Sequence, residues 1–276
     1  MSTAGRSSQL VRTERRPVSM SDFMAEMENL GDAGESVNGL IYGDSNAGKT
    51  WLAGTLPGKT FWLVGEPGYK SAARMGAKGK ARRIGDSATA WAAIEFLEHN
   101  RRYEQLDWII LDGISTMDKR IRLAYANEAF DIDPTKRQHR NLPDKPDYFN
   151  TQNFWTSWIP RLVDMPVNFL ITAHAYRTDN TDGGELLVFP GIQGKVTETA
   201  NSVSGLMDFT GYLEARRLPM RNSDETKLVR RLHFETPARR NKNEQDVRYI
   251  VGDKFNCLGP YMDNPTMPKI LEKISA

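Results

Sequence analysis

The chain has 276 residues, of which 39% are hydrophobic and 26% charged, and its formal net charge is +2 at pH 7. This composition is that of a globular protein with a substantial core, and it excludes a polycation that would bind nucleic acid through its overall charge. The single Cys257 excludes an internal disulfide, and because no apolar run could span a bilayer or form a signal peptide, we predict a cytoplasmic protein without a membrane partner.

Residues 1–36 are predicted to form a basic, flexible N-terminal arm that carries one short helix. Arg12, Arg15 and Arg16 make the arm basic. The segment 21–31 starts with a serine suited to cap a helix, continues with acidic residues and ends in glycine, which predicts an amphipathic helix. This helix either packs on its own domain or docks on a neighbouring subunit, and the sequence leaves both possibilities open.

A phosphate-binding loop follows the arm. The octapeptide GDSNAGKT at 43–50 matches the pattern G-x-x-x-x-G-K-[ST], with a short apolar strand over 37–42 before it and a short helix over 51–56 after it. Backbone N–H groups and the positive end of the helix would bind a polyphosphate, with Lys49 on the β- and γ-phosphates and the Thr50 hydroxyl on Mg²⁺. The predicted nucleotide contacts are Gly43, Asp44, Ser45, Asn46, Ala47, Gly48, Lys49, Thr50 and Trp51.

The second predicted strand, 59–65, ends at Glu66-Pro67-Gly68. A carboxylate just beyond the carboxyl end of a strand beside the phosphate loop can reach the nucleotide. We therefore predict that Glu66 polarises the attacking water, and a glutamate that faces solvent is the alternative. Residues 69–86 are rich in Lys, Arg, Gly and Ala, which indicates an exposed basic loop before a short strand near Ile84.

A helix predicted over 87–100 precedes a second nucleotide motif. The run DWIILD at 107–112 indicates a buried strand that ends in Asp112, which is typical of the Walker B strand, whose aspartate binds the water shell of Mg²⁺. Thr50 and Asp112 are thus the predicted metal-binding residues. Many ring ATPases place the catalytic glutamate directly after this aspartate, but this chain has Gly113, which favours Glu66 as the base.

Two helices are predicted on either side of a basic, proline-containing loop. They cover 116–130 and 148–164, and the loop covers 131–147. Aromatic residues such as Phe154 and Trp158 beside this loop could form a stacking platform for single-stranded nucleic acid. The alternative is that these aromatic side chains face the core.

A third buried strand is predicted over 167–173, and it ends at His174. A polar residue at this place can sense the γ-phosphate, although a histidine at a strand end is often a structural group. A turn over 178–184, a strand over 185–189, a loop over 190–195 and a helix over 196–204 should follow. In a ring or filament this loop could face a central substrate.

The last third of the chain has strand character. Residues 208–217, 227–236 and 247–251 alternate apolar with polar side chains, which predicts antiparallel strands. A basic loop over 237–246 ends near Arg248, and such a cation can reach the nucleotide of a neighbouring subunit. A solvated hairpin loop explains the charges equally well. A short helix is predicted over 268–274.

The order of these motifs resembles that of the RecA-like P-loop ATPases of bacteriophages, a group that includes the single-strand-annealing recombinases. The resemblance extends over about residues 37–250. Its motifs are the phosphate loop, Glu66-Pro67-Gly68, Asp112-Gly113-Ile114-Ser115, Asp147-Tyr148 and Thr172-Ala173-His174.

This resemblance implies an α/β fold of the RecA-like ASCE P-loop NTPase class, with a mainly parallel central sheet flanked by helices and a C-terminal antiparallel extension. Residues 37–255 would form the ATPase core and residues 256–276 a C-terminal tail. The likeness further implies that Glu66 activates water, that His174 senses the γ-phosphate, and that a cation near Arg248 acts in trans.

We therefore expect an ATPase that uses ATP and Mg²⁺, forms a homo-oligomer and acts on single-stranded DNA in recombination, annealing or replication. A single-strand DNA-binding protein is a further expected partner, and a phage-encoded chain would act in the cytoplasm of the host cell. The alternative is a nucleotide-gated oligomeric assembly protein without a DNA substrate. A small-molecule kinase is less favoured, because the chain shows no lid-like arginine cluster beyond an acceptor site.

Overall fold

The computed structural model describes residues 36–180, 184–193, 197–219, 226–241 and 245–276. The predicted arm helix over 21–31 lies outside these residues, as do residues 181–183 and 194–196 of a predicted turn and a predicted loop. The domain boundaries after residues 36 and 255 stay predictions.

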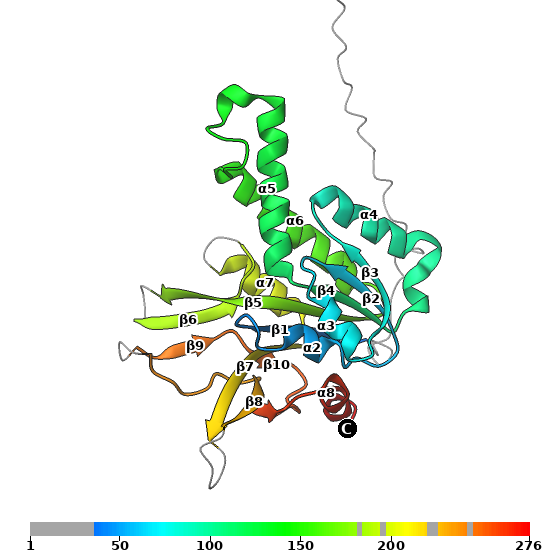
Figure 1. Cartoon of the computed structure of the whole chain (residues 1–276), viewed down its shortest axis with the longest axis vertical. Helices are drawn as coiled ribbons and strands as arrows, with labels where there is room; N and C mark the ends of the chain where they lie inside the picture. Colours follow the sequence, from blue (N-terminus) through cyan, green and yellow to red (C-terminus); the bar gives the residue numbers. More distant parts are fainter. Residues whose placement is uncertain (1–35, 181–183, 194–196, 220–225, 242–244) are drawn as a thin grey trace, which may run out of the picture. The chain divides into compact units, whose positions relative to one another are not determined.

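Parallel strands form the centre of the sheet (Figure 1). The strand order is β11-β8-β7-β1-β5-β4-β2-β3. β1 (Asn38–Gly43), β2 (Lys59–Val64) and β4 (Trp108–Asp112) lie within about one residue of the predicted strands, and with β5 (Asn168–Asn180) they pair in parallel. Continuous apolar runs are typical of parallel strands covered on both faces, which is why these strands could be found in the sequence.

Helices cover both faces of the sheet, because side chains along each central strand alternate between two apolar cores. Leu40 and Ile109 belong to one core, and Ile41 and Ile110 to the other. The first core packs against α4 (Ser87–Glu98), α5 (Ile114–Ile132), α6 (Lys145–Val163) and α7 (Glu198–Leu206), and the second against α2 (Lys49–Ala53), α3 (Tyr69–Arg74) and α8 (Met267–Ile274). A 3-10 helix, η1 (His99–Gln105), follows α4. None of the helices described is long and apolar enough to cross a membrane.

β5 is longer than the predicted strand 167–173. Its second half pairs antiparallel with β6 (Glu185–Pro190), so residues 178–180 belong to a strand and the predicted turn there is wrong. Residues 178–180 are all polar, so the sequence shows no alternation there, and only their pairing with β6 identifies them as a strand. As a result His174 lies within a strand instead of after one.

The last third of the chain forms strands, as predicted, and the antiparallel prediction holds for β7 (Phe209–Pro219) with β8 (Thr226–His233), whereas β9 (Val247–Tyr249) pairs in parallel with β6. β7 also pairs in parallel with β1, so it joins the central sheet to the extension. Other short strands are β10 (Gly252–Asp253) and β11 (Tyr261–Asp263). The predicted α/β fold, with a mainly parallel sheet and additional antiparallel strands, is confirmed.

Residues 69–86 are mostly exposed and basic with a strand next to Ile84, as predicted, but the loop conformation is wrong, because the segment contains α3 and β3 (Lys78–Arg83). β3 pairs in parallel with β2 at the edge of the sheet, and all its residues are exposed. An exposed edge strand needs no apolar face, and its charges oppose unwanted pairing with other chains. The sequence KGKARR therefore lacks the alternation that indicates a half-buried strand.

α5 and α6 extend away from the sheet, and the segment that joins them includes a 3-10 turn, η2 (Pro134–Lys136) (Figure 1). The predicted basic loop over 131–147 is partly helical, since α5 reaches Ile132 and α6 begins at Lys145, and three of its cations pair with its own aspartates. The ion pairs are Lys136–Asp133, Arg137–Asp147 and Arg140–Asp131, at 3.2, 2.6 and 2.7 Å. Phe154 and Trp158 are buried in the core, which confirms the alternative to a stacking platform.

Asp118 joins α5, α6 and the loop after β6. Its carboxylate accepts hydrogen bonds from Trp155 Nε1 (2.9 Å), the Gln193 backbone N–H (3.2 Å) and Arg122 Nη1 (3.1 Å). Burial raises the pKa of Asp118, while Arg122 and the other donors lower it. The carboxylate therefore depends on these three donors to remain charged inside the protein.

Asp118→Ala is expected to lower the free energy of unfolding by about 2 kcal/mol, because it leaves the buried indole N–H and the arginine without their acceptor. Denaturant unfolding of the full chain measures this loss. Asp131→Ala is the matched control, since it breaks an ion pair whose side chains are 58% and 53% exposed, and it should cost less than about 1 kcal/mol. Equal losses in the two variants would contradict a structural role for Asp118.

Candidate active site

The carboxyl ends of the central strands meet at one edge of the sheet. Gly43 at the end of β1 lies beside His174 of β5, and Asp112 at the end of β4 lies beside Thr172 of β5. A cavity of about 400 Å³ opens at this edge. Its lining includes Gly48, Lys49, Thr50, Glu66, Asp112 and His174, which come from four separate predicted motif segments.

Lys49 is the buried cation of this cavity. The residue is only 9% exposed, and its Nζ donates hydrogen bonds to the carbonyl oxygens of Gly43 (3.0 Å) and Asp44 (2.9 Å). Burial lowers the pKa of Lys49, although the nearby carboxylates of Asp112 and Glu66 oppose this shift. Its direct partners are carbonyl oxygens, so an anion that entered the cavity would meet a positive charge held by neutral groups.

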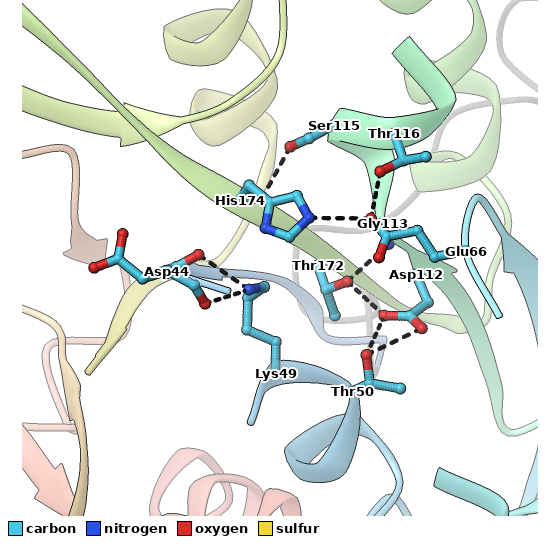
Figure 2. A network of polar contacts seen from close by, with 11 residues as sticks. Asp44, Lys49, Thr50, Glu66, Asp112, Gly113, Ser115, Thr116, Thr172 and His174 are labelled. Atoms are coloured by element: carbon cyan, nitrogen blue, oxygen red, sulfur yellow. Dashed lines mark hydrogen bonds and ion pairs between the residues drawn. The ribbon is translucent and has the colours of Figure 1, made fainter. Parts of the chain in front are cut away.

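The polar side chains of the phosphate loop, from Asp44 to Asn46, are exposed to solvent. The Asp44 carboxylate points away from Lys49 (Figure 2). Arg177 of β5 forms an ion pair with Asp44 at 2.8 Å, outside the polar network. Of the predicted nucleotide contacts, Ser45, Asn46, Gly48, Lys49, Thr50 and Trp51 line the cavity, whereas Gly43, Asp44 and Ala47 do not.

Thr50 and Asp112 face each other as the predicted metal-binding pair. Thr50 Oγ1 donates to Asp112 Oδ1 at 2.9 Å, and Thr172 Oγ1 donates to the same oxygen at 2.7 Å. The backbone N–H of Gly113 donates to Thr172 Oγ1 at 2.9 Å. Burial raises the pKa of Asp112, and the hydrogen bonds from Thr172 and Thr50 oppose this shift. Thr172 thus orients the aspartate from the neighbouring strand.

The space beside this pair fits a small hydrated cation. A β-carbon at Gly68 would lie 3.5 Å from Thr50 Oγ1 and 3.9 Å from Asp112 Oδ2, so only a glycine leaves this side open. The described residues contain no group of three or more His, Cys, Asp or Glu that could hold a metal by themselves. Mg²⁺ suits such a site, because it keeps several waters and is usually bound by one or two protein ligands together with phosphate oxygens.

Glu66 lies beside the metal-binding pair. Its Oε1 accepts a hydrogen bond from the Thr116 hydroxyl and lies 3.0 Å from His174 Nε2 (Figure 2). Partial burial raises the pKa of Glu66, but the hydrogen bonds from Thr116 and His174 outweigh it, and the pKa lies below its ordinary value. A carboxylate held in this way stays charged at neutral pH.

The position after Asp112 explains why the carboxylate comes from another strand. Gly113 has a φ of +83°, and a β-carbon there would lie 3.3 Å from Glu66 Oε1. The Glu66 carboxylate therefore occupies space next to the place where many ring ATPases carry their glutamate. The role of Glu66 as the base stays a prediction.

Arg248 is the one predicted catalytic residue that the structure does not bring to this cavity. It lies on β9 and lines a different cavity of about 700 Å³, together with Arg239 and Arg240. Its action on a neighbouring subunit stays a prediction. Thr172, Thr116 and Arg230 are cavity or network residues to which the sequence assigned no role, because their partners lie on segments far apart in the chain.

One family of known proteins matches most of this chain. The AAA domain family matches residues 35–238 of 276. No curated protein sequence matches the chain. A KaiC-like protein from the hyperthermophilic archaeon Pyrococcus horikoshii OT3 has a similar structure, with a TM-score of 0.38 and 10% identity over 71% of this chain and 77% of that chain.

ATP and Mg²⁺ are the nucleotide and metal that P-loop ATPases generally use, and the residues around Lys49 and Asp112 suit both. The family match covers the phosphate loop, the Walker B strand and β5. The chain therefore belongs to the AAA domain family and is a P-loop NTPase.

Proposed function

We propose that this chain hydrolyses ATP in the cavity at the carboxyl ends of β1, β2, β4 and β5. The observation that carries the proposal is that a charged carboxylate, Glu66, lies beside the Thr50–Asp112 pair in the cavity that holds Lys49. Binding alone would need the loop, the lysine and the metal pair. A second, oriented carboxylate at the edge of the metal site is what hydrolysis requires in addition.

Each residue has a separate task in this proposal. Lys49 would bind the β- and γ-phosphates, and Thr50 and Asp112 would hold Mg²⁺, which when bound neutralises phosphate charge. Glu66 would orient water and accept its proton, because its carboxylate is ionised and has room beside Gly113. His174 would couple this carboxylate to β5 through its contact with Oε1.

We further propose that single-stranded DNA stimulates this turnover through exposed cations of α3 and the edge strand β3, which we call the α3–β3 cations. They are Lys70, Arg74, Lys78, Lys80, Arg82 and Arg83. All six are exposed, none forms an ion pair within the described part of the chain, and residues 69–83 contain no Asp or Glu. Cations without protein partners are free to displace counterions from a phosphate backbone, whereas Lys136, Arg137 and Arg140 are already paired.

ATP turnover with and without single-stranded DNA tests this proposal. The wild type should turn over faster with DNA at low salt, and Lys78→Ala/Lys80→Ala/Arg82→Ala should lose the stimulation while keeping its basal rate. DNA binding by this variant should depend less on salt, with the slope reduced by about 0.7 per cation removed. Lys136→Ala/Arg140→Ala is the matched control, since both cations are exposed but paired. DNA that neither binds nor changes turnover of the wild type at low salt would refute the DNA role and leave hydrolysis intact.

A nucleotide-gated assembly protein is the second candidate. Exposed apolar side chains at the far ends of α5 and α6 favour it, with Ile132 79%, Phe149 63% and Leu142 48% exposed. Where such side chains form one contiguous patch, they mark a protein contact. If nucleotide changes the oligomeric state while DNA binding is undetectable, the assembly function replaces the DNA-stimulated ATPase function.

For the DNA-stimulated ATPase, the resemblance to phage ATPases supports recombination, annealing or replication as the setting. A second copy of the chain and a single-strand DNA-binding protein are its proposed partners.

A further inference from the structure

Arg230 reaches the phosphate loop from the antiparallel extension. It lies on β8, opposite Ala215 of β7, and its side chain lines the cavity that holds Lys49. Its Nε donates a hydrogen bond to the carbonyl oxygen of Ala47 at 3.1 Å. The guanidinium also lies over the ring of Trp51, 5.3 Å from its centroid. One arginine therefore contacts the loop on both sides of Lys49 in the sequence.

Gly48 makes this approach possible. Its φ is +100°, and a β-carbon at this position would lie 2.5 Å from Arg230 Nε, which is closer than real contacts allow. The left-handed backbone favours glycine at this position, and without a β-carbon the arginine side chain can lie directly against the loop.

Asn264 holds the backbone of Arg230 in place. Its side-chain Oδ1 accepts a hydrogen bond from the Arg230 N–H at 3.2 Å, and its own N–H donates to the Arg230 carbonyl oxygen at 2.6 Å. Asn264 has a φ of 45°, a left-handed conformation that asparagine tolerates. These two bonds tie β8 to the segment after β11, so the base of the arginine is fixed while its guanidinium reaches the cavity.

The guanidinium has unused donors. A guanidinium carries five N–H groups, and within the described residues only Nε has a hydrogen-bond acceptor and no carboxylate forms an ion pair with Arg230. Glu66 and His174 make their contacts with Thr116 and with each other, and not with Arg230. The four N–H groups of Nη1 and Nη2 remain, and the edge that these two nitrogens present together, held beside the loop backbone that cradles the α- and β-phosphates, suits bidentate binding of phosphate oxygens.

We propose that Arg230 is a nucleotide-binding residue that acts within its own subunit on the α- and β-phosphates. This inference rests on the proposed ATP site. Since ADP keeps both phosphates, Arg230 contributes equally to the binding of ATP and ADP. A residue that reads the γ-phosphate or the transition state would instead distinguish the two nucleotides or alter the rate.

Calorimetric titration of ADP·Mg²⁺ and ATP·Mg²⁺ into the full chain tests the proposal, combined with turnover kinetics. Arg230→Ala should weaken both affinities about 10-fold and raise KM by the same factor, with kcat within about twofold of wild type. The affinities of Arg230→Lys should lie between those of the wild type and Arg230→Ala, because an ammonium keeps the charge but cannot bind bidentately. Arg231→Ala is the matched control, since this neighbouring arginine pairs with Asp263 at 2.6 Å and does not line the cavity.

Other outcomes overturn the proposal. Affinities equal to those of the Arg231 control would mean that Arg230 only packs on Gly48. Weaker ATP binding with unchanged ADP binding, or a fall in kcat alone, would assign Arg230 to the γ-phosphate. Thermal unfolding without nucleotide shows whether each variant is folded. If Arg230→Ala is unfolded, the affinities of Arg230→Lys test the proposal in its place. Failure of the wild type to bind ADP would instead refute the proposed function.

Discussion

Glu66→Gln is expected to lower the maximal rate of ATP hydrolysis by at least about 100-fold, while ATP affinity stays within about threefold of wild type. Glutamine keeps the shape of the side chain and can still accept the hydrogen bond from Thr116, but it cannot accept a proton. The low pKa of Glu66 indicates that the wild-type carboxylate is ionised at neutral pH, so the substitution removes a real charge. Single-turnover hydrolysis and calorimetric ATP binding measure the two effects separately.

Glu95→Gln is the matched control for this experiment. Glu95 is an exposed residue of α4, and its substitution by glutamine removes the same charge at a place away from the cavity. Its rate and affinity should equal those of wild type. Unchanged turnover in Glu66→Gln would move the base elsewhere, and a loss of ATP binding equal to the loss of rate would show that Glu66 supports the ground state instead.

Most of the site could be predicted because its residues follow local patterns. Lys49 and Thr50 belong to one short motif, and Glu66, Asp112 and His174 each come directly after an apolar run. Parallel strands end at the same edge of a sheet, so three separate runs predict one cluster. The register confirms that the ends of β1 and β4 lie beside His174 and Thr172, which are inside β5, while the roles of these residues stay predictions.

The residues that could not be predicted depend on contacts between distant segments. Thr172 is a polar residue inside an apolar run, and its hydroxyl meets Asp112 only because β5 pairs with β4. Arg230 is separated from Ala47 by 183 positions, and nothing near it in the sequence points to the phosphate loop. Local patterns carry no information about such pairings, which the strand order of the whole sheet decides.

Charge was the least reliable guide in the sequence. Segments 69–86 and 131–147 both look basic, but 131–147 contains four aspartates that accept its cations, and 69–83 contains no acid. The sequence shows that the two segments differ in their number of acidic residues. Which cations form ion pairs depends on how the chain turns between α5 and α6. This is why we propose the α3–β3 cations, and not 131–147, as the surface that binds DNA.

Lys49→Ala is expected to abolish nucleotide binding without destabilising the nucleotide-free protein. The buried ammonium is held by two carbonyl oxygens, so its loss of hydration opposes folding and its removal costs little stability. The same ammonium supplies the positive charge that the phosphates would meet. In the wild type, ADP·Mg²⁺ at 100 times its Kd should raise the free energy of unfolding by about 2.7 kcal/mol, and in the variant it should raise it by nothing measurable.

Thermal unfolding with and without ADP·Mg²⁺ measures both parts of this expectation, with Lys59→Ala as the matched control. Lys59 is exposed at the start of β2, the end of the strand away from Glu66, so its variant should keep the full stabilisation by ADP. If ADP stabilised Lys49→Ala as much as the wild type, the phosphates could not bind beside Lys49 in this cavity. A lower Tm of Lys49→Ala without nucleotide would mean that the lysine closes the loop as a structural group, because its bonds to Gly43 and Asp44 would then outweigh the cost of burying its charge.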